Sequence, residues 1–261
     1  MGGRPMTDIR VSRDDRLVVV TLDRPAVHNA MTLAMWQELA RIFTGLAGDA
    51  SLGAVILTGA GGHFCAGADI GEFGTKRSDA AQGAVYADAV DAATEAIHTL
   101  PRPVIAAIDG FCLGGGCGLA LACDFRFATA EARIGITAAR LSIIYGLKGT
   151  RYLLDTVGLV QAKRVLFSAE RIPAEEALRI GLVDRIVPGP ALDGARSYAA
   201  ELGNNAPLTI AAAKATLNGL VAGTITDEAV TRLQQQALAS FDYAEGRLAF
   251  KEKRPPRFRG A

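Results

Sequence analysis

Short apolar runs, each closed by a turn signal, alternate with longer segments of helical periodicity over the first 150 residues. Buried strands are predicted by the apolar runs at 17–22, 54–57 and 104–108, and shorter strands at 125–128 and 133–136. Helices are predicted from the N-cap Thr32 to about Leu46, over Asp79–Leu100, and after the glycine-rich turn at Gly110–Gly118. Strands that alternate with helices in this way predict an α/β domain with crossover connections.

Beyond about Thr150 the pattern becomes helical, with one short strand predicted at Leu182–Val187. The clearest break is Pro188–Pro190, which divides the chain into a predicted core (1–190) and a helical C-terminal region (191–261). Helices are predicted in this second region at 191–204, 207–221 and 227–253. Their apolar faces have no strands of their own to cover, so we expect them to pack on the core, on each other or on another subunit.

Composition excludes several classes of protein. The 261 residues are 50% hydrophobic and carry a formal net charge of +1, so nothing global attracts the chain to nucleic acid or to an anionic membrane. No apolar run reaches the roughly 18 residues that a membrane span requires, and Met1–Arg10 has no secretory h-region. The four cysteines form no C-x-x-C pair and have no histidine partner, so we expect buried thiols, no metal site and a reducing cytoplasm.

Two glycine-rich loops follow predicted strands, and neither matches a phosphate-binding motif. The chain has no G-x-x-x-x-G-K-[ST] sequence, and Leu119 stands where a dinucleotide fingerprint needs its last glycine. Gly115 lies where a helix begins, so its N–H lacks an intrahelical acceptor and suits a developing oxyanion; a tight packing turn is the alternative. The second loop, His63–Ile70, presents small residues in the same way, and amides from both loops are candidates to bind one oxygen.

Three segments in order resemble the crotonase (enoyl-CoA hydratase/isomerase) superfamily: RPAVHNAM (24–31), HFCAGADI (63–70) and IDGFCLGGGCGLALACD (108–124). Two further segments resemble its downstream parts, RIPAEEALRIGLVDRIV (171–187) and EGRLAFKEKRPPRF (245–258). The resemblance implies an α/β crotonase (ClpP/crotonase-like) spiral of β-β-α units with a helical C-terminal trimerisation region. It also implies an acyl-CoA thioester as substrate, a homotrimer or dimer of trimers, and no cofactor besides the coenzyme A of the substrate.

The same resemblance implies the residues of the site. The amides of Ala68 and Gly115 would form the oxyanion hole for the thioester carbonyl. Residues along the coenzyme A path would be Ala26, His28, Ala30, Ala66, Asp69 and Ile70. Residues beside the acyl chain would be Thr137, Ala138 and Leu141, and Phe250 and Lys253 are further candidates for contact with coenzyme A.

The sequence departs from the hydratases of the superfamily at both catalytic glutamates, whose positions match Gly118 and Ala138. Neither residue can carry a proton, and general acid–base help contributes about 10²- to 10⁴-fold to a rate. Tyr145 stands in a spacing similar to that of the methylmalonyl-CoA decarboxylase branch, and this resemblance makes it a candidate catalytic residue for hydrogen bonding to the substrate carboxylate or to the enolate. The reaction of that branch needs an oxyanion hole and no base to start. A malonyl-type acyl-CoA decarboxylase is therefore one prediction. The alternatives are a hydratase or isomerase with a relocated base such as Glu72, and a non-catalytic acyl-CoA-binding protein.

Overall fold

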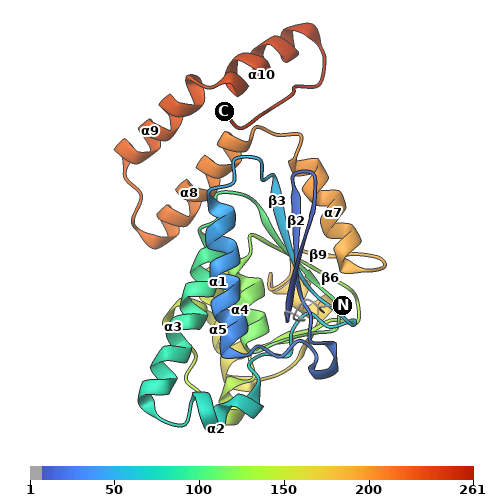
Figure 1. The fold of residues 1–261 in the computed structure, drawn as a ribbon, viewed down its shortest axis with the longest axis vertical. Coiled ribbons are helices and arrows are strands. Elements are labelled where there is room, and N and C mark those ends of the chain that lie inside the picture. The colour runs from blue at the N-terminus through green and yellow to red at the C-terminus, as the bar shows by residue number, and fades with distance from the viewer. Residues whose placement is uncertain (1–7) are drawn as a thin grey trace, which may run out of the picture.

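The computed structural model describes residues 8–261, which form a six-stranded sheet between layers of helices and a second, smaller sheet (Figure 1). The order of the large sheet is β1-β2-β3-β4-β6-β9, with β1 antiparallel to β2 and every other pair parallel. Its strands are β1 (Ile9–Asp14), β2 (Leu17–Leu22), β3 (Ala54–Gly59), β4 (Val104–Ile108), β6 (Phe125–Ala128) and β9 (Arg185–Ile186). The small sheet has the order β5-β7-β8, with strands β5 (Phe111–Leu113), β7 (Arg133–Gly135) and β8 (Ile172–Pro173).

Helices cover both faces of the large sheet, which explains why its central strands are buried and mostly apolar. The helices of the core are α1 (Leu33–Ala47), α2 (Phe73–Lys76), α3 (Ala80–His98), α4 (Gly115–Ala122), α5 (Leu147–Ser168, kinked at Gly158), α6 (Ala174–Arg179) and α7 (Ala191–Leu202). Short 3-10 turns occur at Pro25–Val27, Ile70–Glu72 and Ala138–Leu141. Along β3, Val55 and Leu57 belong to the core beneath α1, α3 and α4, whereas Ala54 and Ile56 belong to the core beneath α7. This alternation is the two-residue period of a strand read out on both faces.

The predicted N-cap of the first long helix is confirmed. The Thr32 hydroxyl accepts a hydrogen bond from the Met35 amide at 3.2 Å, and the apolar face of α1 buries Trp36, Leu39 and Phe43. Because this face lies against the sheet, the indole of Trp36 reaches the loops that end β3 and β5. The cap and the face together fix α1 beside the candidate site.

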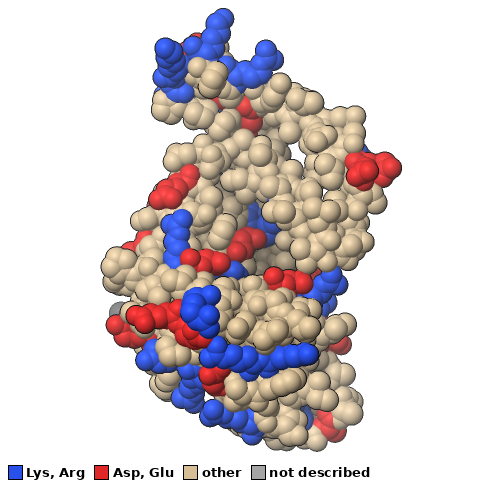
Figure 2. Space-filling view, turned by 180° about the vertical axis from the view of Figure 1, so that it is seen from behind, with Lys and Arg blue, Asp and Glu red and all other residues tan. Residues whose placement is uncertain are grey.

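The C-terminal helices extend away from the sheet (Figure 1). They are α8 (Pro207–Ala222), α9 (Asp227–Leu238) and α10 (Phe241–Glu252). The prediction of a single helix over 227–253 is wrong, because α9 ends at Leu238. Ser240 caps the start of a new helix by accepting a hydrogen bond from Tyr243 N–H at 3.1 Å. Figure 2 shows Lys and Arg side chains gathered at this end of the molecule. The division at Pro190 stays a prediction, and α7 packs on the sheet of the core.

Two strands differ from the sequence-based expectation. Strand β1 was missed because all but one of its residues are exposed on an edge, so it carries no apolar run. Strand β9 is confined to Arg185–Ile186, within the predicted 182–187. None of the helices in residues 8–261 is long and apolar enough to cross a bilayer, and the expectation for the first seven residues lies outside the part that the structure describes.

Candidate active site

The loop after β3 is held in place by backbone hydrogen bonds to neighbouring segments, which leave the amide of Ala68 without a partner among the described residues. Cys65 N–H donates to Phe111 O at 2.8 Å, which lays the loop beside β5. On either side of Ala68, Met31 N–H donates to Gly67 O (2.8 Å) and Asp69 N–H donates to Met31 O (2.9 Å). In such a parallel bridge the amide of the central residue faces away from the partner. Within residues 8–261 the Ala68 N–H has no acceptor.

The second amide belongs to Gly115, the first residue of α4. Gly114 before it has φ 52° and ψ −118°, a conformation that glycine adopts without steric cost. This turn directs the Gly115 N–H to the start of the helix, where it finds no acceptor among the described residues and lies at the positive end of the helix dipole. Gly115 must itself be glycine, because a Cβ there would lie 2.9 Å from Cζ2 of Trp36.

The two amides lie side by side. A Cβ built on Gly115 would be 3.7 Å from the Ala68 nitrogen, and one built on Gly67 would be 3.5 Å from the Gly115 nitrogen. Both residues line the same cavity of about 210 Å³. Two free amides at this separation suit one partly negative oxygen, such as a thioester carbonyl.

Apart from the further candidates Phe250 and Lys253, twelve residues were predicted for the site, and the cavity brings together eight of them. Those that line it are Ala66, Ala68, Ile70, Gly115, Thr137, Ala138, Leu141 and Tyr145. The four that lie outside its lining, as described for residues 8–261, are Ala26, His28, Ala30 and Asp69. Gly118 also lines the cavity, so both positions at which the resemblance predicts missing glutamates face the same space as the amides.

Tyr145 fills the space in front of Gly118. A Cβ on Gly118 would lie 2.5 Å from the Tyr145 hydroxyl, and one on Gly149 would lie 2.6 Å from its ring carbon Cε1. The hydroxyl donates to the carbonyl of Gly114 at 3.3 Å. Burial, together with the neighbouring thiols of Cys117 and Cys112, raises the pKa of Tyr145 well above its usual range. The phenol is therefore a neutral hydrogen-bond donor and not a base.

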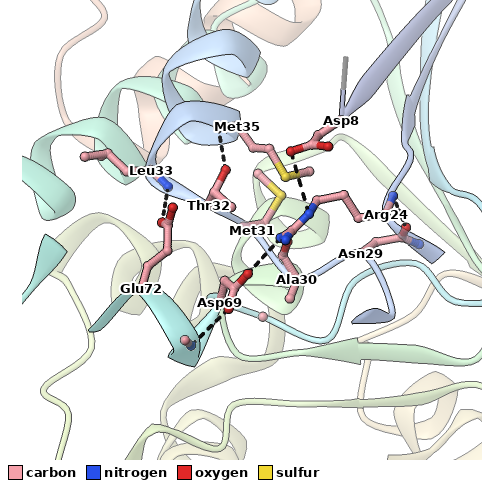
Figure 3. A network of polar contacts seen from close by, with 12 residues as sticks. Asp8, Arg24, Asn29, Ala30, Met31, Thr32, Leu33, Met35, Asp69 and Glu72 are labelled. Carbon is pink, nitrogen blue, oxygen red and sulfur yellow. Dashed lines mark hydrogen bonds and ion pairs between the residues drawn. The ribbon is translucent and has the colours of Figure 1, made fainter. Parts of the chain in front are cut away.

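The carboxylates of Asp69, within the loop that follows β3, and of Glu72, just after it, hold that loop against its neighbours (Figure 3). Figure 3 shows Asp69 directed at Arg24, with Nη1 to Oδ2 at 2.9 Å, and Asp69 also accepts from Gly71 N–H at 3.0 Å. Glu72 points toward the start of α1, where its Oε2 accepts from Leu33 N–H at 2.8 Å. A carboxylate at a helix N-terminus is favourably placed, so the observed contacts give Glu72 a structural role.

The cavity also contains polar residues that the sequence analysis missed, among them Arg77, Tyr86 and Asp91. The Arg77 guanidinium lies over the ring of Tyr86 at 4.7 Å, and the Tyr86 hydroxyl accepts from the Trp36 indole at 2.8 Å. Burial raises the pKa of Tyr86 to about 12. Asp91 lies in the alanine-rich helix α3, in which several acids have similar surroundings in the sequence. Only the rotation of the helix shows which of them faces the cavity.

A cluster of the rings of His28, His63 and Phe111 lies outside the cavity, around the predicted coenzyme A path. The rings of His28 and His63 lie 4.3 Å apart, and His63 stacks on Phe111 at 4.6 Å. Phe111 N–H donates to His63 Nδ1 at 3.1 Å, which fixes this nitrogen as an acceptor. Burial and the neighbouring His28 lower the pKa of His63.

A larger cavity of about 700 Å³ lies between the core and α8. Its charged residues are paired with each other, for example Lys148 with Glu95 at 3.2 Å and Lys214 with Asp124 at 2.8 Å. Figure 2 likewise shows a hollow in which side chains of both signs lie close together. Neither predicted oxyanion donor lines this cavity, so the smaller one is the candidate active site.

This α/β fold presents two free amides to one cavity, which is the arrangement of a protein that binds a carbonyl oxygen. Comparison with known proteins identifies the family. Residues 12–261 match the family enoyl-CoA hydratase/isomerase. The chain is 36% identical over 215 residues to a short-chain-enoyl-CoA hydratase of Clostridium acetobutylicum, with 82% of both chains covered. It is 34% identical over 261 residues to the 2,3-dehydroadipyl-CoA hydratase of Escherichia coli, with 98% of this chain and 100% of the relative covered.

A solved structure shows the same fold. The crystal structure of an enoyl-CoA hydratase/carnithine racemase from Magnetospirillum magneticum has a TM-score of 0.94 at 35% identity, with 98% of this chain and 97% of that chain covered. The chain belongs to the enoyl-CoA hydratase/isomerase family, and the α/β fold of β-β-α units expected from its motifs is confirmed.

Proposed function

We propose that this chain binds an acyl-CoA thioester in the 210 Å³ cavity and stabilises its enolate with the Ala68 and Gly115 amides. The observation that carries the proposal is that two neighbouring amides have no acceptor within residues 8–261 and line one cavity. A donor of this kind contributes about 10²- to 10³-fold to kcat in enzymes that develop an oxyanion. The coenzyme A portion would run past Ala26, His28 and Ala30 on the outside.

We further propose that the reaction is the decarboxylation of a malonyl-type thioester. The bond between C2 and the carboxylate breaks, CO₂ leaves, and the electron pair forms the enolate, whose charge falls on the thioester oxygen. A proton from solvent then adds to C2. This sequence needs no base, which suits a cavity in which Gly118 and Ala138 offer no titratable group and Tyr145 occupies the space in front of Gly118.

Charge in the cavity supports an acyl group that carries an acid. Arg77 is the one Lys or Arg side chain among the described lining residues, and no carboxylate of residues 8–261 forms an ion pair with it. Its guanidinium is held over the rings of Phe73 (4.6 Å) and Tyr86 (4.7 Å). A partly buried cation with no protein counterion favours an anionic ligand. A malonyl-type acyl group provides one, whereas a simple enoyl chain does not.

The second candidate is a hydratase with relocated acid–base chemistry. Two observations favour it: the relatives above are named hydratases, and Asp91 is the one carboxylate that lines the cavity in residues 8–261. In this candidate Asp91, rather than Glu72, would activate the water. An isomerase that uses the same carboxylate differs only in where the proton is returned.

One set of assays separates these candidates. The purified chain is mixed with methylmalonyl-CoA and ethylmalonyl-CoA, and the loss of CO₂ is followed; crotonyl-CoA is tested in parallel by the loss of its conjugated thioester absorbance. Turnover of the malonyl-type thioesters alone supports the decarboxylase. Hydration that is abolished in Asp91→Asn and retained in Glu72→Gln supports the hydratase. Tight thioester binding with no turnover on either panel contradicts both and leaves an acyl-CoA-binding protein.

We also propose that the chain works as a homotrimer or a dimer of trimers in the cytoplasm. Support comes from large apolar side chains left exposed on the extended C-terminal helices, among them Leu217, Leu220 and Phe250, of which Phe250 is 88% exposed. Large apolar side chains are usually buried, so those exposed on these helices are favourable contacts for a second copy of the chain. Sedimentation equilibrium of the purified chain tests the assembly, and a monomer at micromolar concentration contradicts it.

A further inference from the structure

The peptide group between Gly114 and Gly115 is hydrogen-bonded at its carbonyl end and presents its N–H to the cavity. Its carbonyl oxygen accepts two hydrogen bonds, from Gly118 N–H at 3.1 Å and from the Tyr145 hydroxyl at 3.3 Å. Its N–H is the Gly115 amide, which faces the cavity and has no acceptor in the part of the chain that the structure describes. A hydroxyl on one side of this peptide is therefore linked to an oxyanion donor on the other side.

Hydrogen bonds that share a peptide group strengthen one another. A donor at the carbonyl oxygen draws electron density from the amide nitrogen, so the N–H of the same peptide becomes more positive and binds an anion more strongly. Condensed-phase chains of this kind gain roughly 10–30% per bond. The gain rises as charge develops on the oxyanion, so it favours the transition state over the bound substrate.

The single proton of the phenol decides between this role and a direct one. A tyrosine hydroxyl has one hydrogen to donate, and in this structure it is directed at Gly114 O. The ring is held in place because it packs directly against Gly118 and Gly149. The space that a Cβ would take at either glycine is already filled by the tyrosine. Burial keeps the pKa of Tyr145 well above its usual range, so the proton stays in place throughout the working pH range.

We propose that Tyr145 is a positioning residue: its hydroxyl polarises the Gly114–Gly115 peptide and so strengthens the Gly115 oxyanion donor. The proposal rests on the proposed function, since it assumes that the two amides bind the thioester oxygen. It differs from a role for Tyr145 as a proton donor to the enolate or as a ligand of the substrate carboxylate. In the present arrangement substrate need not touch the phenol at all.

The size of the effect follows from the value of a whole donor. Loss of one oxyanion donor costs about 10²- to 10³-fold in kcat, and the polarisation contributes roughly 10–30% of one bond. Tyr145→Phe should therefore lower kcat about 2- to 8-fold with little change in KM. The pH profile of kcat should keep its shape, because no group that titrates in this range is removed.

The direct readout is the polarisation of a bound thioester carbonyl. A conjugated dienoyl-CoA is bound to the wild type and to Tyr145→Phe, and the red shift of its absorbance is measured together with the infrared stretch of a ¹³C-labelled thioester carbonyl. The matched control is Tyr152→Phe, which removes the hydroxyl of a tyrosine on α5 that donates to Glu95 at 3.4 Å, away from this cavity. We expect a smaller shift in Tyr145→Phe and the wild-type shift in Tyr152→Phe.

Two results overturn the proposal. One is an unchanged carbonyl shift in Tyr145→Phe; the other is a loss of kcat beyond about 100-fold, which would place the hydroxyl on the reacting atoms. If Tyr145→Phe is too unstable to assay, Gly118→Ala keeps the phenol and displaces it from Gly114, and the same smaller shift is expected. A wild type that binds the thioester with no red shift at all contradicts the two-amide grip itself, which separates failure of the proposed function from failure of this inference.

Discussion

The close approach of Tyr145 to Gly118 gives a prediction whose size follows from the structure. In Gly118→Ala the new methyl carbon would lie 2.5 Å from the tyrosine hydroxyl, so the hydroxyl must retreat by about 1 Å to reach an ordinary nonbonded separation. Overpacking of this kind costs about 1–3 kcal/mol, and alanine returns about 1 kcal/mol of helix propensity. We expect Gly118→Ala to lower the free energy of unfolding by up to about 2 kcal/mol.

The same substitution should be harmless once the hydroxyl is gone. The ring carbon Cζ lies 3.7 Å from the position of the added methyl carbon, which is ordinary contact. In the Tyr145→Phe background, Gly118→Ala should therefore be neutral or stabilising by up to about 1 kcal/mol. The double-mutant cycle should give a coupling of about 1–3 kcal/mol.

The cycle is measured by urea denaturation of the wild type, the two single variants and the double variant, all at the same protein concentration. The fluorescence of the single tryptophan, Trp36, is the probe. Gly83→Ala on α3 is the matched control, because a Cβ there meets nothing within 4 Å and reports helix propensity alone. Additive effects of the two substitutions, within about 0.5 kcal/mol, would mean that the Tyr145 hydroxyl does not occupy the space in front of Gly118. A side chain at position 118 would then be compatible with the tyrosine.

Three further predictions test other parts of the site. Gly115→Ala places a methyl carbon 2.9 Å from the Trp36 ring, so the oxyanion donor must shift and kcat should fall by about 10²-fold or more in a steady-state assay. Glu72→Gln weakens the carboxylate contact at the start of α1 and should lower the unfolding free energy by about 0.5–1.5 kcal/mol in urea; a large loss of decarboxylation would refute this structural role. Burial and His28 lower the pKa of His63 below its ordinary 6.5, so the unfolded chain takes up the proton first as pH falls. Stability should decline below about pH 6.5, and His63→Gln should flatten that decline in thermal melts.

Local pattern was sufficient for the elements that bury an apolar surface. The strand at 17–22 was predicted because both of its faces are apolar, and the helix capped by Thr32 because it has one apolar face. Burial of those residues decides the structure. Strand β1 escaped because its pairing with β2 is satisfied by backbone hydrogen bonds and its side chains are exposed. The end of α9 before Ser240 was also not predicted, because a capped helix start and a continued helix differ little in free energy.

The candidate site divides in the same way. The small residues around Ala68 and Gly115 mark a backbone function and were visible in the motifs. The side chains of Arg77 and Asp91 were not, because their position in the cavity depends on how α3 packs against α1 and α2 against α3, which no local pattern encodes. The contact between Tyr145 and Gly118 joins residues 27 positions apart, and only the folded structure shows that they compete for one volume.

The burial of all four cysteines has a practical consequence for studying this protein. Burial raises the pKa of Cys65 to about 12 and that of Cys123 to about 12, so these thiols form almost no thiolate at neutral pH. Maleimides and mild oxidants should therefore leave the native chain unmodified. A cysteine introduced on the exposed surface of α9 would then be the one reactive thiol among residues 8–261, which allows a fluorophore or spin label to be attached there without removing any native residue.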